Sequence, residues 1–374
     1  MNVLTIGGAT QDLYLHITGE DVMTITQQGC IMTYLLFESG QKAEISNLES
    51  FTGGGATNTA FSFKKQGLNS ACFCNVGNDE QGQRIIKELE RAMVATSYIT
   101  TICDQQTGSS FMVNAVTKER TTFTFRGANL SLDLASIDAK TIAAHSLLYI
   151  TSLSQKATQS LPKLTALAKK NNVKVAINPG SSQLKQDTLQ LKESLKDIDI
   201  LIVNSAEART FMTALTKLDE TYKKLLQTPL VACRSLPLNM LNKKPYLLET
   251  PLVFENYSFS LRNFFKEVLA MGPSIVVVTN GGNGVYAATQ ESLYFHPSAD
   301  ITVCDNIGAG DAFGSSFVGS LLLDDTIEDA MRNGIVNSAS VLQKMGAKPG
   351  LLTREQQQSY VKELPKNALL IEPL

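Results

Sequence analysis

The chain has 374 residues, of which 33 are lysine or arginine and 35 are aspartate or glutamate, giving a formal net charge of −2. This length allows one large core with a smaller appendage, and two equal domains would also fit it. The near-neutral balance, without long runs of like charge, excludes a nucleic-acid footprint and a polybasic membrane patch and favours a small soluble substrate.

The first residues, MNVLTIGGATQDLYLHI, contain neither a charged segment followed by a sustained apolar one nor a small-residue cleavage site. The chain also lacks an uninterrupted apolar run long enough for a membrane span. We therefore expect a cytoplasmic protein. The six cysteines have irregular spacings and the three histidines lie far apart, so neither set predicts a disulfide framework or a metal site.

The first predicted element is a buried strand over residues 3–8, a short apolar run that ends in two glycines and opens into a loop carrying Asp12. Residues 34–45 and 109–125 mix aromatic, β-branched and polar residues without a helical period. This composition predicts half-exposed antiparallel strands outside the main sheet.

A regular alternation of helices and strands follows, and it predicts a doubly wound, mostly parallel α/β sheet. Residues 218–257 interrupt it with four prolines and exceed the usual length of a connection, so we interpret them as a surface insertion. The predicted helices cover residues 132–144, 159–170 and 310–323, and the predicted strands cover 147–152, 173–177, 198–203 and 274–278.

The most specific motif is DNIGAGDAF, residues 305–313, which follows an extended stretch at 301–304 and leads into the last predicted helix. Gly308 and Gly310 allow the backbone to approach a ligand closely, so that amide groups at the helix start can point at one phosphate. Asp311 then falls in the first turn, where a carboxylate can accept the proton of an attacking hydroxyl during phosphoryl transfer. The alternative is an ordinary carboxylate that complements the helix dipole.

Upstream, GGGATN at residues 53–58 precedes an apolar helical stretch at 59–65. Three glycines remove side-chain bulk where a sugar ring would lie close to the main chain, and the Asn58 amide would face its hydroxyls. Taken alone, a glycine triplet is more often a flexible turn.

Two further motifs follow predicted strands. Asn204 and Glu207 stand three residues apart at a helix start, where Glu207 would hold waters of Mg²⁺ or, equally well, complete a capping box. The turn TNGGNG, residues 279–284, would wrap phosphates with its backbone amides and the Thr279 hydroxyl, or form a hairpin tip, or both.

With these motifs in this order, the chain resembles the ribokinase-like (PfkB) family of carbohydrate and nucleoside kinases from residue 1 to about residue 350. Residues 305–313 are similar to that family's second signature, and residues 53–58 are similar to its first. The resemblance implies a Mg²⁺-dependent enzyme that moves the γ-phosphoryl group of ATP to a hydroxyl of a small sugar or sugar-like substrate.

The resemblance also implies an architecture and a role for individual residues. One ribokinase-like domain would span residues 1–374, with a β lid formed by about 13–50 and 108–127 through which two copies would form a homodimer. Asp311 would be the general base, and the anion hole would come from Gly308, Ala309 and Gly310. The implied ligand contacts are Asp12, Gly54, Gly55 and Asn58 for the substrate, Asn204, Thr279, Gly281, Gly284, Asn333 and Asn337 for the nucleotide, and Glu207 for Mg²⁺.

The chain departs from the common family pattern at two positions, where Asn306 replaces a frequent threonine and Asn178 replaces an acidic residue before Pro179. Some family members need a monovalent cation such as K⁺ beside the anion-hole loop. Asp305 and Ile307 occupy the matching positions, but backbone ligands leave little trace in a sequence.

Three other functions compete with a sugar kinase. A nucleoside kinase would use aromatic lid residues to stack on a base, and Phe37, Phe111, Phe123 and Phe125 are available for that. A non-catalytic sensor would not need a base such as Asp311. A dinucleotide-binding dehydrogenase is disfavoured because Gly7-Gly8-Ala9 lacks the G-x-G-x-x-G spacing.

Overall fold

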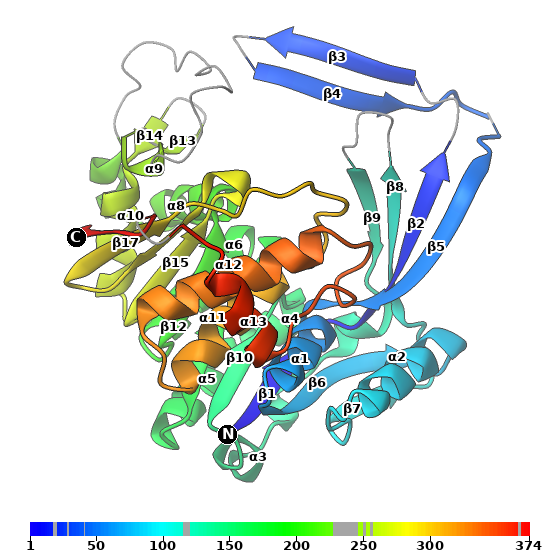
Figure 1. The fold of residues 1–374 in the computed structure, drawn as a ribbon. Coiled ribbons are helices and arrows are strands. Elements are labelled where there is room, and N and C mark those ends of the chain that lie inside the picture. The colour runs from blue at the N-terminus through cyan, green and yellow to red at the C-terminus, as the bar shows by residue number, and fades with distance from the viewer. Residues whose placement is uncertain are drawn as a thin grey trace.

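The computed structural model describes residues 1–17, 21–27, 30–40, 42–114, 120–226, 246–249, 252–254, 257–365 and 368–374. Within them, a large sheet carries helices on both faces, and a separate small sheet projects from one side (Figure 1). None of the described helices is long and apolar enough to cross a lipid bilayer.

The large sheet has the strand order β18-β17-β16-β15-β12-β11-β10-β1-β6-β7. The strands from β7 to β15 run parallel, and the last three pair antiparallel at one edge. The prediction of a doubly wound, mostly parallel sheet is therefore confirmed. Its strands are β1 (Asn2–Ile6), β6 (Asn69–Gly77), β7 (Ile99–Ile102), β10 (Leu147–Ile150), β11 (Lys174–Ile177), β12 (Ile200–Asn204), β15 (Ile275–Thr279), β16 (Val285–Ala288), β17 (Ser292–His296) and β18 (Leu370–Pro373).

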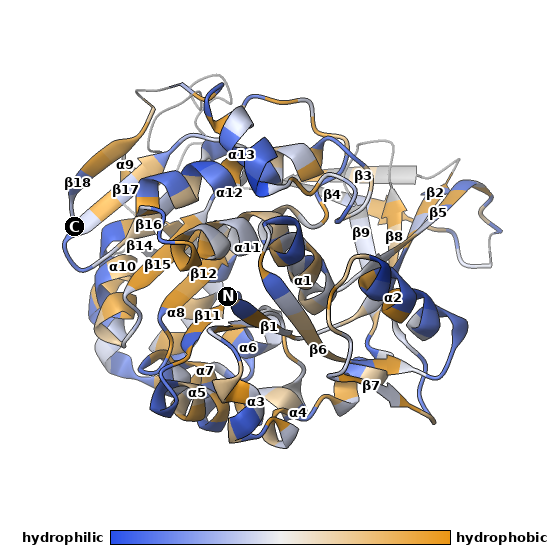
Figure 2. Cartoon of the chain, turned by 60° about the horizontal axis from the view of Figure 1, so that its bottom comes forward, coloured by the Kyte–Doolittle hydropathy of each residue, from blue (hydrophilic) through white to orange (hydrophobic). Residues whose placement is uncertain are grey.

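Helices cover both faces of this sheet, so successive residues of one strand enter two different cores. Leu148 and Ile150 pack with α5, α7, α8 and α10, whereas Tyr149 between them packs with α1, α11 and α12. This double burial explains why the strands are continuous apolar runs, and β12 and β15 are orange in Figure 2. The helices are α1 (Gly55–Lys65), α2 (Glu80–Arg91), α3 (Ala139–Ala143), α4 (Gln155–Gln159), α5 (Leu161–Lys170), α6 (Ser181–Lys185), α7 (Thr188–Leu195), α8 (Ser205–Leu218), α9 (Tyr246–Glu249), α10 (Leu261–Ala270), α11 (Ala309–Leu322), α12 (Ile327–Leu342) and α13 (Arg354–Val361).

The small sheet has the strand order β5-β2-β8-β9, with β2 (Thr10–Ile17), β5 (Ile45–Gly53), β8 (Gly108–Asn114) and β9 (Arg120–Phe125). A hairpin of β3 (Asp21–Gln27) and β4 (Cys30–Leu36) extends beyond it (Figure 1). Because strand residues alternate between faces, Asp12 and Tyr14 share the buried face of β2. The opposite face of the small sheet carries Phe111, Phe123 and Phe125, which are exposed.

Two local predictions are wrong. The helix expected over residues 132–144 is reduced to a 3₁₀ turn at Leu134–Ser136 and the short α3. Asp138 interrupts it because its carboxylate caps α3, accepting a hydrogen bond of 2.7 Å from the backbone of Thr141. Residues 301–304, expected to be extended, belong to no strand, and the turn before α11 follows irregular backbone.

The region expected to be a surface insertion, residues 218–257, is partly built into the core. Residues 227–245 lie outside the described part of the chain. Within the described part, Leu247 and Leu252 are buried in the core cluster on the α8 and α10 side of the sheet, as is Phe259 just beyond the region. The last two lie on the antiparallel strands β13 (Leu252–Phe254) and β14 (Tyr257–Phe259), so this hairpin covers the core rather than projecting from it.

Candidate active site

The turn before α11 presents free amide groups to open space. Gly308 caps the helix in the left-handed conformation, with φ of 77°, and a Cβ at this position would lie 2.4 Å from the Cβ of Ala347. Glycine is therefore required there for two independent reasons. At Gly310 a Cβ would meet no atom within 4 Å. The first amides of α11, from Ala309 onward, have no partner inside the helix and are available to an anion.

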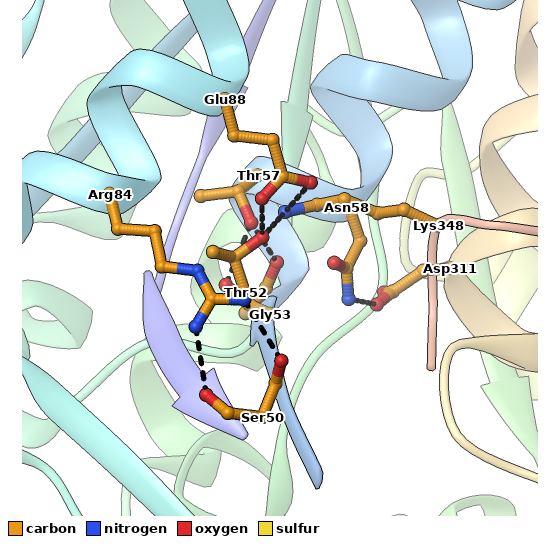
Figure 3. Close-up of polar contacts among 10 residues, drawn as sticks. Ser50, Thr52, Gly53, Thr57, Asn58, Arg84, Glu88, Asp311 and Lys348 are labelled. Carbon is orange, nitrogen blue, oxygen red and sulfur yellow. Dashed lines mark hydrogen bonds and ion pairs between the residues drawn. The ribbon is translucent and has the colours of Figure 1, made fainter. Parts of the chain in front are cut away.

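Asp311 lies in the first turn of α11, beside these amides. Its carboxylate accepts a 2.9 Å hydrogen bond from the Asn58 side chain of α1, which brings together two predicted site residues that are 253 positions apart (Figure 3). Burial raises the pKa of Asp311 to about 6, and the nearby carboxylates of Asp12 and Glu207 act in the same direction. The Asn58 hydrogen bond and the Lys348 ammonium oppose the rise in pKa.

Asn58 also offers an unused acceptor. Its side chain is 4% exposed, and its Oδ1 atom is buried without a hydrogen-bond partner among the described residues. Buried polar atoms rarely remain unpaired in native proteins. A ligand that donates a hydrogen bond would satisfy this one.

Asp12 is the second carboxylate of the site, on the buried face of β2. Its Oδ1 atom accepts a 2.9 Å hydrogen bond from Thr10, and burial raises its pKa. A Cβ at Gly53 would lie 1.9 Å from Asp12 Oδ2, so the carboxylate rests directly on the glycine turn. A Cβ at the neighbouring Gly54 would clash with the backbone of Gly8, and a Cβ at Gly55 would clash with the Thr151 side chain. These glycines therefore let α1 pack closely on the ends of β1 and β10.

Asn204 and Thr279 are paired neighbours at the carboxyl ends of β12 and β15. Asn204 is exposed and forms a complete capping box with Glu207, with both hydrogen bonds at 2.8 Å. The capping alternative is therefore present in the structure. Burial raises the pKa of the Glu207 carboxyl.

The 279–284 turn is a hairpin with an open tip. It joins β15 to β16, and the Asn280 amide donates a 2.8 Å hydrogen bond to the Gly284 carbonyl. Gly281 has φ of 54°, and a Cβ there would meet nothing within 4 Å. Gly284 has φ of 103°, and a Cβ at this position would clash with the His296 carbonyl. The Asn283 and Gly284 amides also donate to carbonyls within the turn, so the open space lies around Gly281, while the base of the turn is held against β17.

Asn333 and Asn337, predicted to contact the nucleotide, form hydrogen bonds inside the protein. Asn337 is fully buried, donates to the Ala312 carbonyl at 2.9 Å and accepts from the Leu352 amide at 2.9 Å. Asn333 is buried and donates to the Ser320 hydroxyl at 2.9 Å. Both side chains lie on the α11 face of α12, so we assign them to helix packing rather than to the nucleotide.

A cavity of about 1120 Å³ lies beside the hairpin tip. Its walls come from residues 296–301, from α12, from residues 349–352 and from α13. The Ser298 hydroxyl donates to the Gly282 carbonyl, which joins the cavity wall to the tip. Asp311 does not line the cavity, so a molecule that fills the cavity must extend beyond it to reach the carboxylate.

The matches to known proteins agree with this geometry. Residues 25–233 and 260–354, more than half of the chain, match the family model described as pfkB family carbohydrate kinase. The chain belongs to this family. It is an ATP-dependent sugar kinase, as the resemblance of residues 53–58 and 305–313 had implied.

Similar proteins of this pfkB family include several ribokinases. The ribokinase of Haemophilus influenzae is 24% identical over 318 residues, covering 85% of this chain and 89% of the relative. The bifunctional ribokinase/ribose-5-phosphate isomerase A of Fructilactobacillus sanfranciscensis is 23% identical over 319 residues, and this chain, covered to 84%, spans only 51% of that relative. The solved ribokinase of Arabidopsis thaliana, complexed with ribose and ATP, superposes with a TM-score of 0.72 at 17% identity, covering 96% of this chain and 98% of the other, which shows a shared fold.

One residue of this pfkB-family kinase, Lys348, was missed by the sequence analysis. It is buried, donates a 2.6 Å hydrogen bond to the Thr52 hydroxyl and lies 3.6 Å from the Glu88 carboxylate of α2 (Figure 3). Burial lowers its pKa, whereas the carboxylates of Glu88 and Asp12 raise it. An isolated lysine in a loop gives no sequence signal, because its partners come from distant segments.

Tyr14 was also missed, and it connects the small sheet to the anion-binding turn. Its hydroxyl donates a 2.8 Å hydrogen bond to Asp305 Oδ2, which also accepts from the Gly346 amide at 3.0 Å. The other carboxylate oxygen of Asp305 accepts from the Ile307 amide at 2.8 Å. The buried face of β2 therefore touches the residues that shape the turn at Gly308.

Proposed function

We propose that this pfkB-family kinase transfers the γ-phosphoryl group of ATP to a hydroxyl of a small sugar or sugar-like molecule, with Asp311 as general base. The observation that carries the proposal is the position of Asp311 beside the open amides of the Gly308 turn, bonded to Asn58. With a pKa of about 6, Asp311 is ionised at neutral pH yet basic enough to take a proton during the reaction.

The acceptor would bind between the buried face of the small sheet and α1. A sugar hydroxyl would donate to Asn58 Oδ1, and a second one would donate to the carboxylate of Asp12. The hydroxyl nearest Asp311 would lose its proton to that carboxylate as it attacks phosphorus. Relatives named for sugar substrates support this acceptor class, including an ATP-dependent ribose-1-phosphate kinase of Halopiger xanaduensis, 22% identical over 311 residues.

A nucleoside acceptor receives less support from the lid. Phe111 and Phe123 pair across β8 and β9 and, together with Phe125, lie on the exposed face of the small sheet, opposite Asp12. In this arrangement they do not stack on a base held against Asp12. We therefore favour a sugar, although a solved nucleoside kinase of Methanocaldococcus jannaschii shares the fold with a TM-score of 0.67.

The donor would bind along the hairpin tip, with its nucleoside in the adjoining cavity. The open amides around Gly281, together with the Thr279 hydroxyl, would hold phosphate oxygens. The amides of Ala309 and Gly310 would stabilise the negative charge that develops on the transferred group. A solved putative ribokinase II of Escherichia coli in complex with ATP and Mg²⁺ shares this fold, with a TM-score of 0.69.

Glu207 fits the chemistry of Mg²⁺, which prefers oxygen ligands and retains much of its water. Only its Oε2 atom accepts the cap hydrogen bond from Asn204, which leaves the second carboxylate oxygen to hold metal-bound water. Bound Mg²⁺ would neutralise phosphate charge. The Asp305 carboxylate accepts hydrogen bonds from Tyr14, Ile307 and Gly346, so backbone oxygens near it are the better ligands for a monovalent cation such as K⁺.

The exposed face of the small sheet supports a homodimer formed through the lid. Phe111, Phe123 and Phe125 are 37%, 54% and 46% exposed, and the exposed Leu48 lies on the same face of the sheet, on β5. Apolar patches of this kind commonly mark protein interfaces. Light scattering should find a dimer that Phe123→Asp converts to monomers.

Replacing Asp311 by Asn tests the proposed function. The variant should bind Mg·ADP normally but lose turnover by roughly 10² or more, because the base is gone while the shape and the Asn58 hydrogen bond remain. Asp329→Asn is the matched control, since Asp329 is a first-turn carboxylate of α12 at the surface. ATP consumption should be assayed against a panel of sugars, sugar phosphates and nucleosides, and full activity of Asp311→Asn with the best acceptor would remove Asp311 from its role.

A further inference from the structure

His296, the last residue of β17, has a fixed tautomer and an unused acceptor. Its Nδ1 atom lies 2.7 Å from the Pro297 carbonyl oxygen. A carbonyl only accepts hydrogen bonds, so the proton of the neutral ring must reside on Nδ1. Nε2 is then a bare acceptor, and it is buried without a partner among the described residues, in a side chain that is 1% exposed.

The surroundings of His296 keep the ring neutral. Burial lowers its pKa and the Arg332 guanidinium acts in the same direction, whereas the hydrogen bond to Pro297 opposes them. A second proton on Nε2 would place a charge in a buried position beside a cation. The atom therefore stays an acceptor at neutral pH.

His296 lines the cavity beside the hairpin tip. Alternation along β17 places its side chain on the same face as Tyr294, which packs in the core shared with α12. The backbone of His296 pairs with Val285 and touches Gly284, so the ring stands next to the turn that would hold the donor's phosphates. A buried side chain with an unsatisfied acceptor thus forms part of the wall of a cavity of about 1120 Å³, which has room for a nucleoside.

We propose that His296 Nε2 accepts a hydrogen bond from the exocyclic amino group of the donor's base and thereby selects adenine over a 6-oxopurine. This inference rests on the proposed function, which puts the donor nucleoside in this cavity. Adenine offers an amino N–H to the bare nitrogen. Inosine and guanosine nucleotides offer a carbonyl oxygen at the same position, so two lone pairs would face each other.

The apolar part of the cavity wall favours a base over a ribose as the partner of His296. Val336, Ala339, Leu351 and Leu352 line the same cavity and suit the faces of a flat ring. A ribose hydroxyl is also a donor, so a deoxyribose nucleotide is needed to tell the two sources apart.

Calorimetric binding of Mg·ADP and Mg·IDP to the full chain tests the proposal without relying on turnover. The unchanged protein should bind ADP roughly 10- to 100-fold more tightly than IDP, because IDP leaves a buried acceptor unpaired. His296→Leu should reduce this ratio to within about threefold by weakening ADP binding and relieving the repulsion of IDP. His296→Gln, whose amide both donates and accepts hydrogen bonds, should also narrow the ratio of ADP to IDP affinity. It replaces His296→Leu as the test if the Leu variant is too unstable to measure.

Tyr294→Phe is the matched control, since it alters the same face of β17 two residues earlier, and it should preserve the preference for ADP. Equal binding of ADP and IDP by the unchanged protein would overturn the inference, with water occupying Nε2, yet leave the kinase proposal standing. Failure to bind ADP at all would overturn both. A different outcome is that 2′-deoxy-ADP binds as weakly as IDP and that His296→Leu abolishes the difference in affinity between ADP and 2′-deoxy-ADP. That result would identify the ribose hydroxyl as the hydrogen-bond donor to His296 and would show that the proposed base contact is wrong.

Discussion

The acceptor side and the donor side of the site are built in opposite ways. On the acceptor side, Asp12, Asn58 and Lys348 are buried and Asp311 is half-buried, and hydrogen bonds hold these four side chains, which come from four distant segments. On the donor side, Asn204 is exposed, and Gly281 and Gly282 leave open space around the main chain of the 279–284 tip. The first region depends on burial and charge, and the second depends on main-chain shape.

This difference decides which substitutions are costly. A buried charged cluster sets the protonation state of each member, so removing one side chain alters the others. Substitution of a nearby side chain leaves backbone amides in place unless an added Cβ changes the backbone conformation. We therefore expect changes in pH dependence from the acceptor side and changes in nucleotide affinity from the donor side.

The largest effect is expected where the two sides meet, at Gly308. Gly308→Ala would force a Cβ to within 2.4 Å of Ala347 and impose a left-handed conformation on alanine. We expect turnover to fall by roughly 10²-fold as the anion-hole amides move, and the free energy of unfolding to fall by about 1–3 kcal/mol. Steady-state kinetics and denaturant titration measure the two losses.

Two glycine variants serve as comparisons for Gly308→Ala. Gly67→Ala has a similar backbone strain, with φ of 85°, but no atom within 4 Å, so it should cost only about 1 kcal/mol and leave turnover intact. Gly281→Ala, on the open donor side, should raise the KM for ATP several-fold with little change in kcat. Equal losses from Gly281→Ala and Gly308→Ala would contradict the division into two differently built regions.

The next largest effect is a shift of the pH profile in Lys348→Met. Activity requires ionised Asp311, so kcat/KM for the acceptor should rise with pH through about 6 and then level off. Lys348 lowers the pKa of Asp311, hence its removal should move this limb upward by about one unit, costing roughly fivefold at pH 6 and little at pH 8.5. Lys362→Met, an exposed change, should leave the profile in place. A uniform loss at every pH would mean that Lys348 only supports Thr52 and the fold.

The smallest effect is expected from Glu207→Gln. Glutamine keeps an oxygen for the Asn204 amide, so the capping box of α8 survives, but the negative charge near the metal is removed. The Mg²⁺ concentration for half-maximal activity should rise a few-fold at unchanged melting temperature. An identical Mg²⁺ titration would leave Glu207 with a capping role alone.

The sheet was predictable because its strands are buried on both faces, and such strands need apolar residues at successive positions of the sequence. Asp311 and Gly308 were predictable because a phosphate cradle needs glycines and a helix start within a few residues. The helix expected over 132–144 failed because a single capping residue, Asp138, outweighed the apolar periodicity.

The remaining misses concern contacts between distant segments. The role of Lys348 follows only from its contacts with Glu88 and Thr52, which lie some 260 to 296 residues earlier in the sequence. The nucleotide role predicted for Asn337 stays a prediction, because an amide on a helix can satisfy the core or a ligand, and its hydrogen bond to α11 favours the core. Local pattern cannot supply either fact.

The bond from Tyr14 to Asp305 has a consequence for how this kinase handles water. Asp12, which would hold the sugar, and Tyr14, which touches the anion-binding turn, project from the same face of one strand. A sugar that pulls β2 inward would also press on the turn, so the phosphate cradle would reach its final shape only when an alcohol is present. ATP bound alone would then be shielded from futile hydrolysis.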